Sequence, residues 1–159
     1  MLALGSRIVV GTTGWYSQLA EMKALAEKRG GALLYGTNFS IGVQKLFRLT
    51  AELASLDGYK FEISETHHTS KVDAPSGTAI TLKEIIHRVQ PGIEIPVESH
   101  RVGDAKGEHV VRATSEYDVI ELRHDAFTRR GFALGAVRAA EWVHNKSGAW
   151  EFREIFDQL

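Results

Sequence analysis

Apolar residues in the first part of the chain follow two alternating patterns. Consecutive apolar residues at 8–10 and 32–35 are typical of short buried strands, and a glycine follows each run. Between them, apolar side chains recur three or four positions apart: Leu19, Met22, Leu25 and Ala26. This spacing predicts a helix over residues 17–29 that ends at Gly30. A strand, a helix and a second strand predict a parallel crossover unit, the building block of nucleotide-binding folds.

The second part of the chain predicts a larger sheet with covering helices. Strands are expected at 59–64, 93–99, 108–113 and 118–123, and Pro96 favours an edge position or a bulge. Helical spacing marks three further segments: Leu46, Phe47, Thr50, Leu53 and Ala54; Ala79, Leu82, Ile85, Ile86 and Val89; and, within 130–144, Ala133, Val137, Ala140 and Val143. The pattern predicts a mixed β-sheet with helices on one face, so the fold class is α/β (α+β).

Composition and charge exclude several classes of function. The chain has 159 residues, of which 43% are hydrophobic and 25% are charged, as expected of a globular protein with a core. A net charge of −1 and a pI near 6.7 give no field that would recruit nucleic acid or a membrane surface. Cysteine is absent, which excludes disulfides and thiol chemistry. With no apolar run of membrane-spanning length, we expect a cytoplasmic protein.

Residues 65–79 concentrate the candidate chemistry. His67, His68 and Lys71 supply proton carriers and a positive charge, which suits a site that holds an anion and protonates it. Ser76 is a favourable N-cap, so Gly77 and the residue after it are expected in the first helical turn, where free N–H groups favour an anion. The alternative remains open at this point, because adjacent histidines often lie at a strand end without a catalytic role. A metal site is not predicted, since the two adjacent histidines of an extended strand point apart.

The same segment resembles the signature of a known enzyme family. Its pattern Glu-x-His-His-x-x-Lys-x-Asp-Ala-Pro-Ser-Gly-Thr-Ala is similar to that of the dihydrodipicolinate reductases, and every fixed position is present over 65–79. The resemblance extends to Val9–Trp15, Asn38–Val43, Ser99–His109 and Arg130–Ala140, and so to nearly the whole chain from Ile8.

The resemblance implies a function and a set of site residues. It implies reduction of 4-hydroxy-tetrahydrodipicolinate with NADH or NADPH in lysine and diaminopimelate biosynthesis. It makes His67 and Lys71 the acid–base pair, and His68, Gly77 and Thr78 the residues that bind the substrate carboxylates. It further implies a homo-oligomer, expected to be a tetramer, built through the sheets of the second domain.

The resemblance also assigns two loops to the cofactor. The expected cofactor-binding residues are Gly11, Thr12, Thr13, Gly36, Thr37, Asn38 and Phe39. On spacing alone these glycines would be ordinary turns at strand ends. Asp73 is expected to be a structural partner of its turn, and His109 and His124 are expected to be structural.

One departure from the family pattern affects the expected domains. The glycine-rich pyrophosphate turn of Gly-x-x-Gly-x-x-Gly type does not precede the first strand. We therefore expect residues 1–38 to be a remnant of a Rossmann-type dinucleotide-binding domain, 39–149 a substrate-binding and oligomerisation domain, and 150–159 a segment that packs back on the body. The alternative function is a catalytically inactive family member that serves as an oligomerisation or dicarboxylate-binding domain.

Overall fold

The computed structural model describes residues 1–12 and 14–159, which form two compact units. Unit 1 consists of Met1–Gln44 and Arg130–Leu159, and unit 2 is Lys45–Arg129. The sequence pattern predicts residues 130–149 in the second domain. Here they pack in unit 1, because the last strand of the chain pairs with a strand from the N-terminal part.

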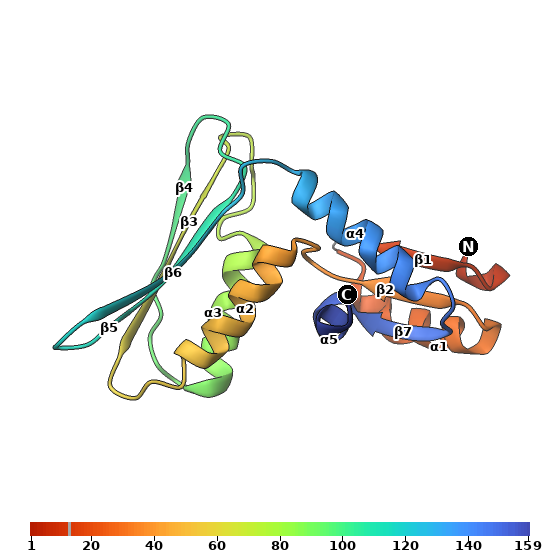
Figure 1. Cartoon of the computed structure of the whole chain (residues 1–159), viewed down its shortest axis with the longest axis horizontal. Helices are drawn as coiled ribbons and strands as arrows, with labels where there is room; N and C mark the ends of the chain where they lie inside the picture. The colour runs from red at the N-terminus through yellow and green to blue at the C-terminus, as the bar shows by residue number, and fades with distance from the viewer. Residues whose placement is uncertain (13) are drawn as a thin grey trace. The chain divides into compact units, whose positions relative to one another are not determined.

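Unit 1 is built on a parallel sheet with strand order β1-β2-β7 (Figure 1). Its strands are β1 (Arg7–Val10), β2 (Ala32–Tyr35) and β7 (Gly148–Glu151). Its helices are η1 (Leu2–Leu4), η2 (Tyr16–Gln18), α1 (Leu19–Arg29), α4 (Arg130–Val143), α5 (Phe152–Ile155) and η3 (Phe156–Gln158). The predicted parallel crossover from β1 through α1 to β2 is confirmed, and Gly30 ends α1 in the left-handed conformation.

The central strand of unit 1 buries both of its faces. Ala32 and Leu34 point into a cluster with α4 and α5, whereas Leu33 and Tyr35 point into a cluster with α1. Because both faces are covered, β2 reads as a continuous apolar run rather than an alternating one.

Two details of unit 1 differ from the sequence expectations. Residues 148–151 form a strand, although Gly-Ala-Trp-Glu has no strand-like alternation, because β2 supplies its hydrogen-bonding partner. In α4 the buried face carries Gly135, Ala139 and Val143. Of the four positions predicted for this face, Val143 is confirmed, whereas Ala133, Val137 and Ala140 are exposed. The reason is close backbone packing: a Cβ at Gly135 would lie 1.7 Å from the carbonyl oxygen of Phe39.

Unit 2 contains a four-stranded mixed sheet with strand order β4-β3-β5-β6. Its elements are β3 (Lys60–His67), α3 (Gly77–Val89), β4 (Val97–Arg101), β5 (Glu108–Thr114), β6 (Val119–Asp125) and most of α2 (Ile41–Leu53). The β3–β4 pair is parallel and the other two pairs are antiparallel, which confirms the mixed sheet. Strand β4 lies at an edge, as Pro96 indicated, but begins at Val97 rather than at residue 93.

The helices of unit 2 cover one face of this sheet, as expected (Figure 1). All five positions predicted for the inner face of α2 and its end are buried, as are four of the five predicted for α3; Val89 is exposed. On the covered face β3 contributes Phe61 and Ile63 near its start and the polar residues Glu65 and His67 near its end. The apolar part of this face forms the core of unit 2, and the polar part contains the candidate site. Among the described residues, no helix has the length and apolarity needed to cross a membrane.

Candidate functional site

His67 ends strand β3 with its ring turned toward the covered face of the sheet. Residues two apart on a strand share a face, so Glu65 lies beside it. The Nδ1 atom of His67 contacts Oε2 of Glu65, a carboxylate that is wholly inaccessible to solvent. Next to the other ring nitrogen lies Gly107: a Cβ built there would be 3.2 Å from Nε2.

The second oxygen of Glu65 is also occupied. Oε1 accepts hydrogen bonds from Nη2 of Arg101 at 3.0 Å and from the backbone N–H of Ser76 at 3.3 Å. Arg101 reaches this point from β4, which lies beside β3 in parallel register. The same guanidinium donates to the carbonyl oxygens of Asp73 (2.6 Å) and Lys71 (3.3 Å), so it ties the 71–73 loop to the buried carboxylate.

These contacts set the charge states of the pair. Burial by itself would raise the pKa of the Glu65 carboxyl, but the groups of Arg101, Ser99 and His67 beside it outweigh burial and hold the pKa below its ordinary value. Burial lowers the pKa of His67, and the charges of Lys71 and Arg101 act in the same direction, against the attraction of Glu65. At neutral pH the pair is therefore an ionised Glu65 and a neutral His67.

Lys71 lies in the loop after β3, with a side chain that is 21% exposed. Its ammonium group donates to both carboxylate oxygens of Asp73, at 2.7 and 2.9 Å. This pairing lowers the pKa of Asp73. Asp73 thus has the position of a structural partner for the turn, as the sequence indicated.

The residues expected to bind carboxylates lie on both sides of this loop. His68 is half-buried, and its Nδ1 lies 2.7 Å from Oγ of Ser70. Gly77 and Thr78 form the first turn of α3. The predicted N-cap is confirmed, because Oγ of Ser76 accepts a hydrogen bond from the Ala79 N–H at 3.2 Å.

His109 joins this cluster from β5. Its ring stands edge-on to His67 with 5.1 Å between the ring centroids, and its Nε2 lies 3.2 Å from Oγ of Ser76. Burial, followed by the neighbouring His67, lowers the pKa of His109 to about 3. The local sequence pattern does not single out Glu65 or Arg101 as site residues, and it predicts a structural role for His109. The period of two along β3 was a signal for Glu65, but Arg101 and His109 come from other strands and are brought in by pairing.

Glu65, His67 and His109 could in principle hold a metal ion, since one ligand atom of each lies within 4.8 Å of the others. Protein donors already occupy both oxygens of Glu65, however, and the His67 contact is too close for an ion between the two groups. Arg101 adds a positive charge beside the carboxylate. The cluster is therefore better explained as a hydrogen-bonded network than as a metal centre.

The expected cofactor residues lie in unit 1, after β1 and β2. These strands are parallel, so both loops emerge at the carboxyl edge of the sheet, where ligands of such folds bind. Gly11, Thr12 and Thr37 are exposed there. Thr13 lies outside the described residues.

The other expected cofactor residues have roles within the protein. Asn38 is half-buried, with Oδ1 accepting from the Ser40 N–H at 2.8 Å, and Phe39 packs on the ring of Phe152. Gly36 is buried, and a Cβ there would lie 3.0 Å from Cβ of Phe152, so packing alone explains this glycine. The exposed members of the expected cofactor residues are accessible to a ligand, whereas Gly36, Asn38 and Phe39 stabilise the fold.

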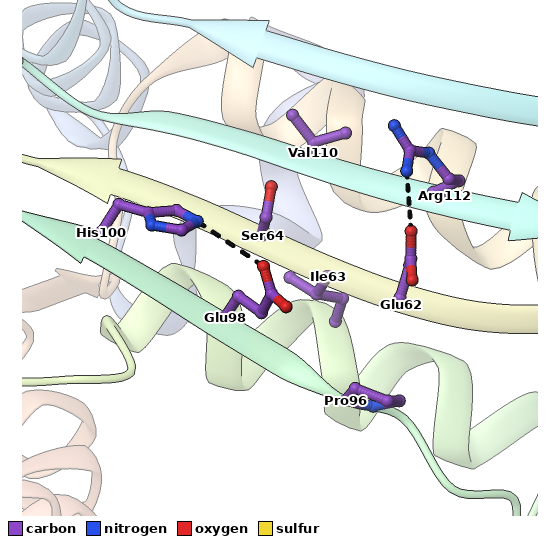
Figure 2. Close-up of a pocket in the computed structure, with 8 residues that line it drawn as sticks. All are labelled: Glu62, Ile63, Ser64, Pro96, Glu98, His100, Val110 and Arg112. Atoms are coloured by element: carbon purple, nitrogen blue, oxygen red, sulfur yellow. Dashed lines mark hydrogen bonds and ion pairs between the residues drawn. The ribbon is translucent and has the colours of Figure 1, made fainter.

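The uncovered face of the unit 2 sheet has a shallow hollow of about 350 Å³. Figure 2 shows its lining, in which Arg112 pairs with Glu62 at 2.9 Å and His100 lies 3.7 Å from Glu98. The remaining lining residues are Ile63, Ser64, Pro96 and Val110. These ion pairs are solvated, in contrast to the buried network on the other face.

Comparison with known proteins gives consistent results. The family described as dihydrodipicolinate reductase, C-terminus, matches residues 42–156. A protein of Christiangramia forsetii named 4-hydroxy-tetrahydrodipicolinate reductase is 38% identical, over 96% of this chain and 70% of that protein. A protein of the same name from Haloarcula marismortui is 39% identical, over 96% of this chain and 68% of that protein.

A solved structure shares the fold as well. Dipicolinate-bound dihydrodipicolinate reductase from Paenisporosarcina sp. TG-14 superimposes with a TM-score of 0.79 at 26% identity. The match covers 96% of this chain and 64% of that protein. The chain thus spans about two thirds of the length of the proteins it matches.

Proposed function

Because the chain belongs to the dihydrodipicolinate reductase family, we propose that it acts in the NAD(P)H-dependent reduction of 4-hydroxy-tetrahydrodipicolinate to tetrahydrodipicolinate. This reaction would place it in lysine and diaminopimelate biosynthesis, in the cytoplasm. The observation that carries the proposal is the arrangement around His67. The carboxylate of Glu65 contacts the neutral, buried His67 and the N-cap of α3. Through Arg101 it is also connected to the loop that carries Lys71.

The two proton carriers have different charge states, which suggests a division of roles. The ammonium group of Lys71 can attract an anionic substrate and donate a proton to it. His67 is neutral and suited to accept a proton. Asp73 and Arg101 hold the side chain and the backbone of Lys71, so the donor has a fixed place.

The start of α3 suits a substrate carboxylate. Its N-terminal N–H groups and the dipole of a 13-residue helix favour negative charge. A Cβ added to Gly77 would meet no described heavy atom within 4 Å, so a ligand can approach the backbone closely. We propose that Gly77, Thr78 and His68 bind the two carboxylates of a small cyclic substrate.

The exposed residues at the carboxyl edge of the unit 1 sheet would hold the cofactor. These are Gly11, Thr12 and Thr37, with Asn38 at the margin. When bound, NADH or NADPH would supply the hydride. The proposed contribution of unit 2 is to bind and orient the substrate and to move the proton.

Ligand binding and turnover can be tested separately. Pyridine-2,6-dicarboxylate should raise the melting temperature of the chain, because a ligand at a hundredfold excess over its Kd stabilises the folded state by about 2.7 kcal/mol. Lys71→Ala should weaken this shift, and Lys60→Ala, an exposed lysine at the start of β3, should leave it unchanged. The absence of a shift at millimolar ligand would contradict the substrate site.

Turnover is measured as NAD(P)H oxidation with freshly prepared substrate. The reductase proposal would be supported if the wild type and Lys60→Ala oxidise NAD(P)H and Lys71→Ala does not. His67→Gln should lower kcat more than it changes KM, and His68→Gln should mainly raise KM. Dicarboxylate binding without any oxidation would overturn the reductase proposal in favour of a dicarboxylate-binding domain.

The uncovered face of the unit 2 sheet is the proposed surface for self-association into a tetramer. The described helices of unit 2 cover the opposite face, and this one presents Val110 among charged residues. Light scattering at micromolar concentration should give four times the 17.6 kDa of one chain. A mass equal to that of one chain would contradict the proposal.

A further inference from the structure

Glu65 is a buried charged side chain to which the proposed reaction gives no role. Each of its oxygens accepts from a different part of unit 2: Oε2 from His67, and Oε1 from Arg101 and from the backbone of Ser76. An ionised carboxylate is an acceptor only. Every group that faces Glu65 must therefore be a donor.

This requirement decides the tautomer of His67. A neutral imidazole carries one proton, and the contact with Glu65 Oε2 places it on Nδ1. The lone pair then lies on Nε2. Gly107 is next to that atom, with φ +132 and no side chain, and a Cβ would intrude to 3.2 Å from Nε2.

The same carboxylate also locates the helix that is proposed to bind the substrate. Its Oε1 holds the N–H of Ser76, the N-cap residue immediately before Gly77. The proton carrier and the anion-binding turn are thus fixed relative to one another through a single side chain.

We propose that Glu65 is a positioning residue that holds His67 as the Nδ1–H tautomer, so that Nε2 is the proton-accepting atom, and that also fixes the start of α3. This inference rests on the proposed function, since it specifies how His67 would act. It differs from a merely structural role in fixing which ring nitrogen carries the proton.

Replacing Glu65 by glutamine turns this into a sharp test. The glutamine amide has an oxygen on one side and an NH₂ on the other. At the position of Oε1 it faces two donors, Arg101 and the Ser76 N–H, and at the position of Oε2 it faces His67. Arg101 and the Ser76 N–H cannot become acceptors, whereas His67 can by moving its proton to Nε2. The amide NH₂ should therefore face His67, and Glu65→Gln should switch the tautomer.

Long-range ¹H–¹⁵N NMR of the ¹⁵N-labelled chain at about pH 8 reads the tautomer directly. The His67 signals are assigned by their loss in His67→Gln. In the wild type, Nδ1 should be the protonated nitrogen and Nε2 the unprotonated one, and Glu65→Gln should exchange the two. Glu62→Gln, an exposed glutamate on the same strand, should leave the wild-type pattern.

Two results would overturn the inference: a wild-type His67 protonated on Nε2, or an unchanged pattern in a folded Glu65→Gln variant. If that variant fails to fold, the wild-type spectrum alone still decides the tautomer. The measurement uses neither substrate nor cofactor. A chain with the expected tautomer but no dicarboxylate binding would therefore disprove the proposed function and leave the role of Glu65 in orienting His67 intact.

Discussion

The two faces of the unit 2 sheet carry the same kinds of side chain in different surroundings. On the covered face Glu65 pairs with Arg101 and His67, and the glutamate is wholly buried. On the uncovered face Arg112 pairs with Glu62 and Glu121, and all three side chains are about half exposed.

Neighbouring positions on the same strand thus differ mainly in solvation. Water competes for each contact on the uncovered face, so the ion pairs there have little effect on stability. On the covered face Glu65, His67 and Arg101 depend on one another for their hydrogen bonds, and the pKa values of Glu65 and His67 are shifted. Burial, rather than residue type, therefore makes one of the two clusters a candidate for chemistry.

The largest expected difference between the faces is in stability. Arg101→Met removes the partner of a buried carboxylate and should lower the free energy of unfolding by about 3–5 kcal/mol. Arg112→Met removes an arginine that also bonds two carboxylates but is solvated, and it should have little effect. Urea unfolding at pH 7 measures both variants. Similar losses for the two would show that the faces do not differ as described.

A second expected difference concerns acid. The pKa of His109 is about 3 in the folded protein and near 6.5 when the chain is unfolded, so the unfolded state binds the extra proton. This contribution to stability is fully present above pH 6.5 and is lost as the pH falls toward 3. The loss for one histidine is at most about 1.4 kcal/mol per pH unit.

The pKa values of His67 and His124 are also lowered, mainly by burial, so their protonation adds to the slope. Between pH 6.5 and 4.5, unfolding of His109→Gln should take up as much as one proton fewer than unfolding of the wild type. The free energy of unfolding of the variant should therefore depend less steeply on pH. Urea titrations across that range would contradict the assignment if wild type and variant lost stability in parallel.

The smallest expected difference is in the response to salt. Raising NaCl from 0.05 to 0.5 M screens solvated charges much more than buried ones. The stability difference between wild type and Arg112→Met should shrink with salt, and that between wild type and Arg101→Met should persist. Both should be measured at protein concentrations where light scattering gives the same mass for all variants, because Arg112 also lines the proposed association surface. A salt-sensitive Arg101 difference would indicate that water reaches the buried pair.

Much of the fold follows from local patterns in the sequence. The apolar spacing of α2 and α3, the N-cap at Ser76 and the alternation of β3 and β5 are readable because each depends on residues a few positions apart. The pattern did not indicate β7, whose pairing partner is more than a hundred residues away in the chain. It also indicated only Val143 of the inner face of α4, because that face is set by the approach of Phe39 to Gly135.

For the candidate site, the local sequence was enough to single out the residues proposed for the chemistry. His67, Lys71 and the Ser76–Thr78 turn lie within one short segment, and their residue types already predict proton transfer to an anion. Only the tertiary structure decided their states. Glu65 becomes a buried acceptor, and Arg101 and His109 become its neighbours, because β4 and β5 flank β3 in register and α3 covers their ends. The physical reason is that charge state and tautomer depend on solvation and on partners distant in sequence, neither of which a local pattern contains.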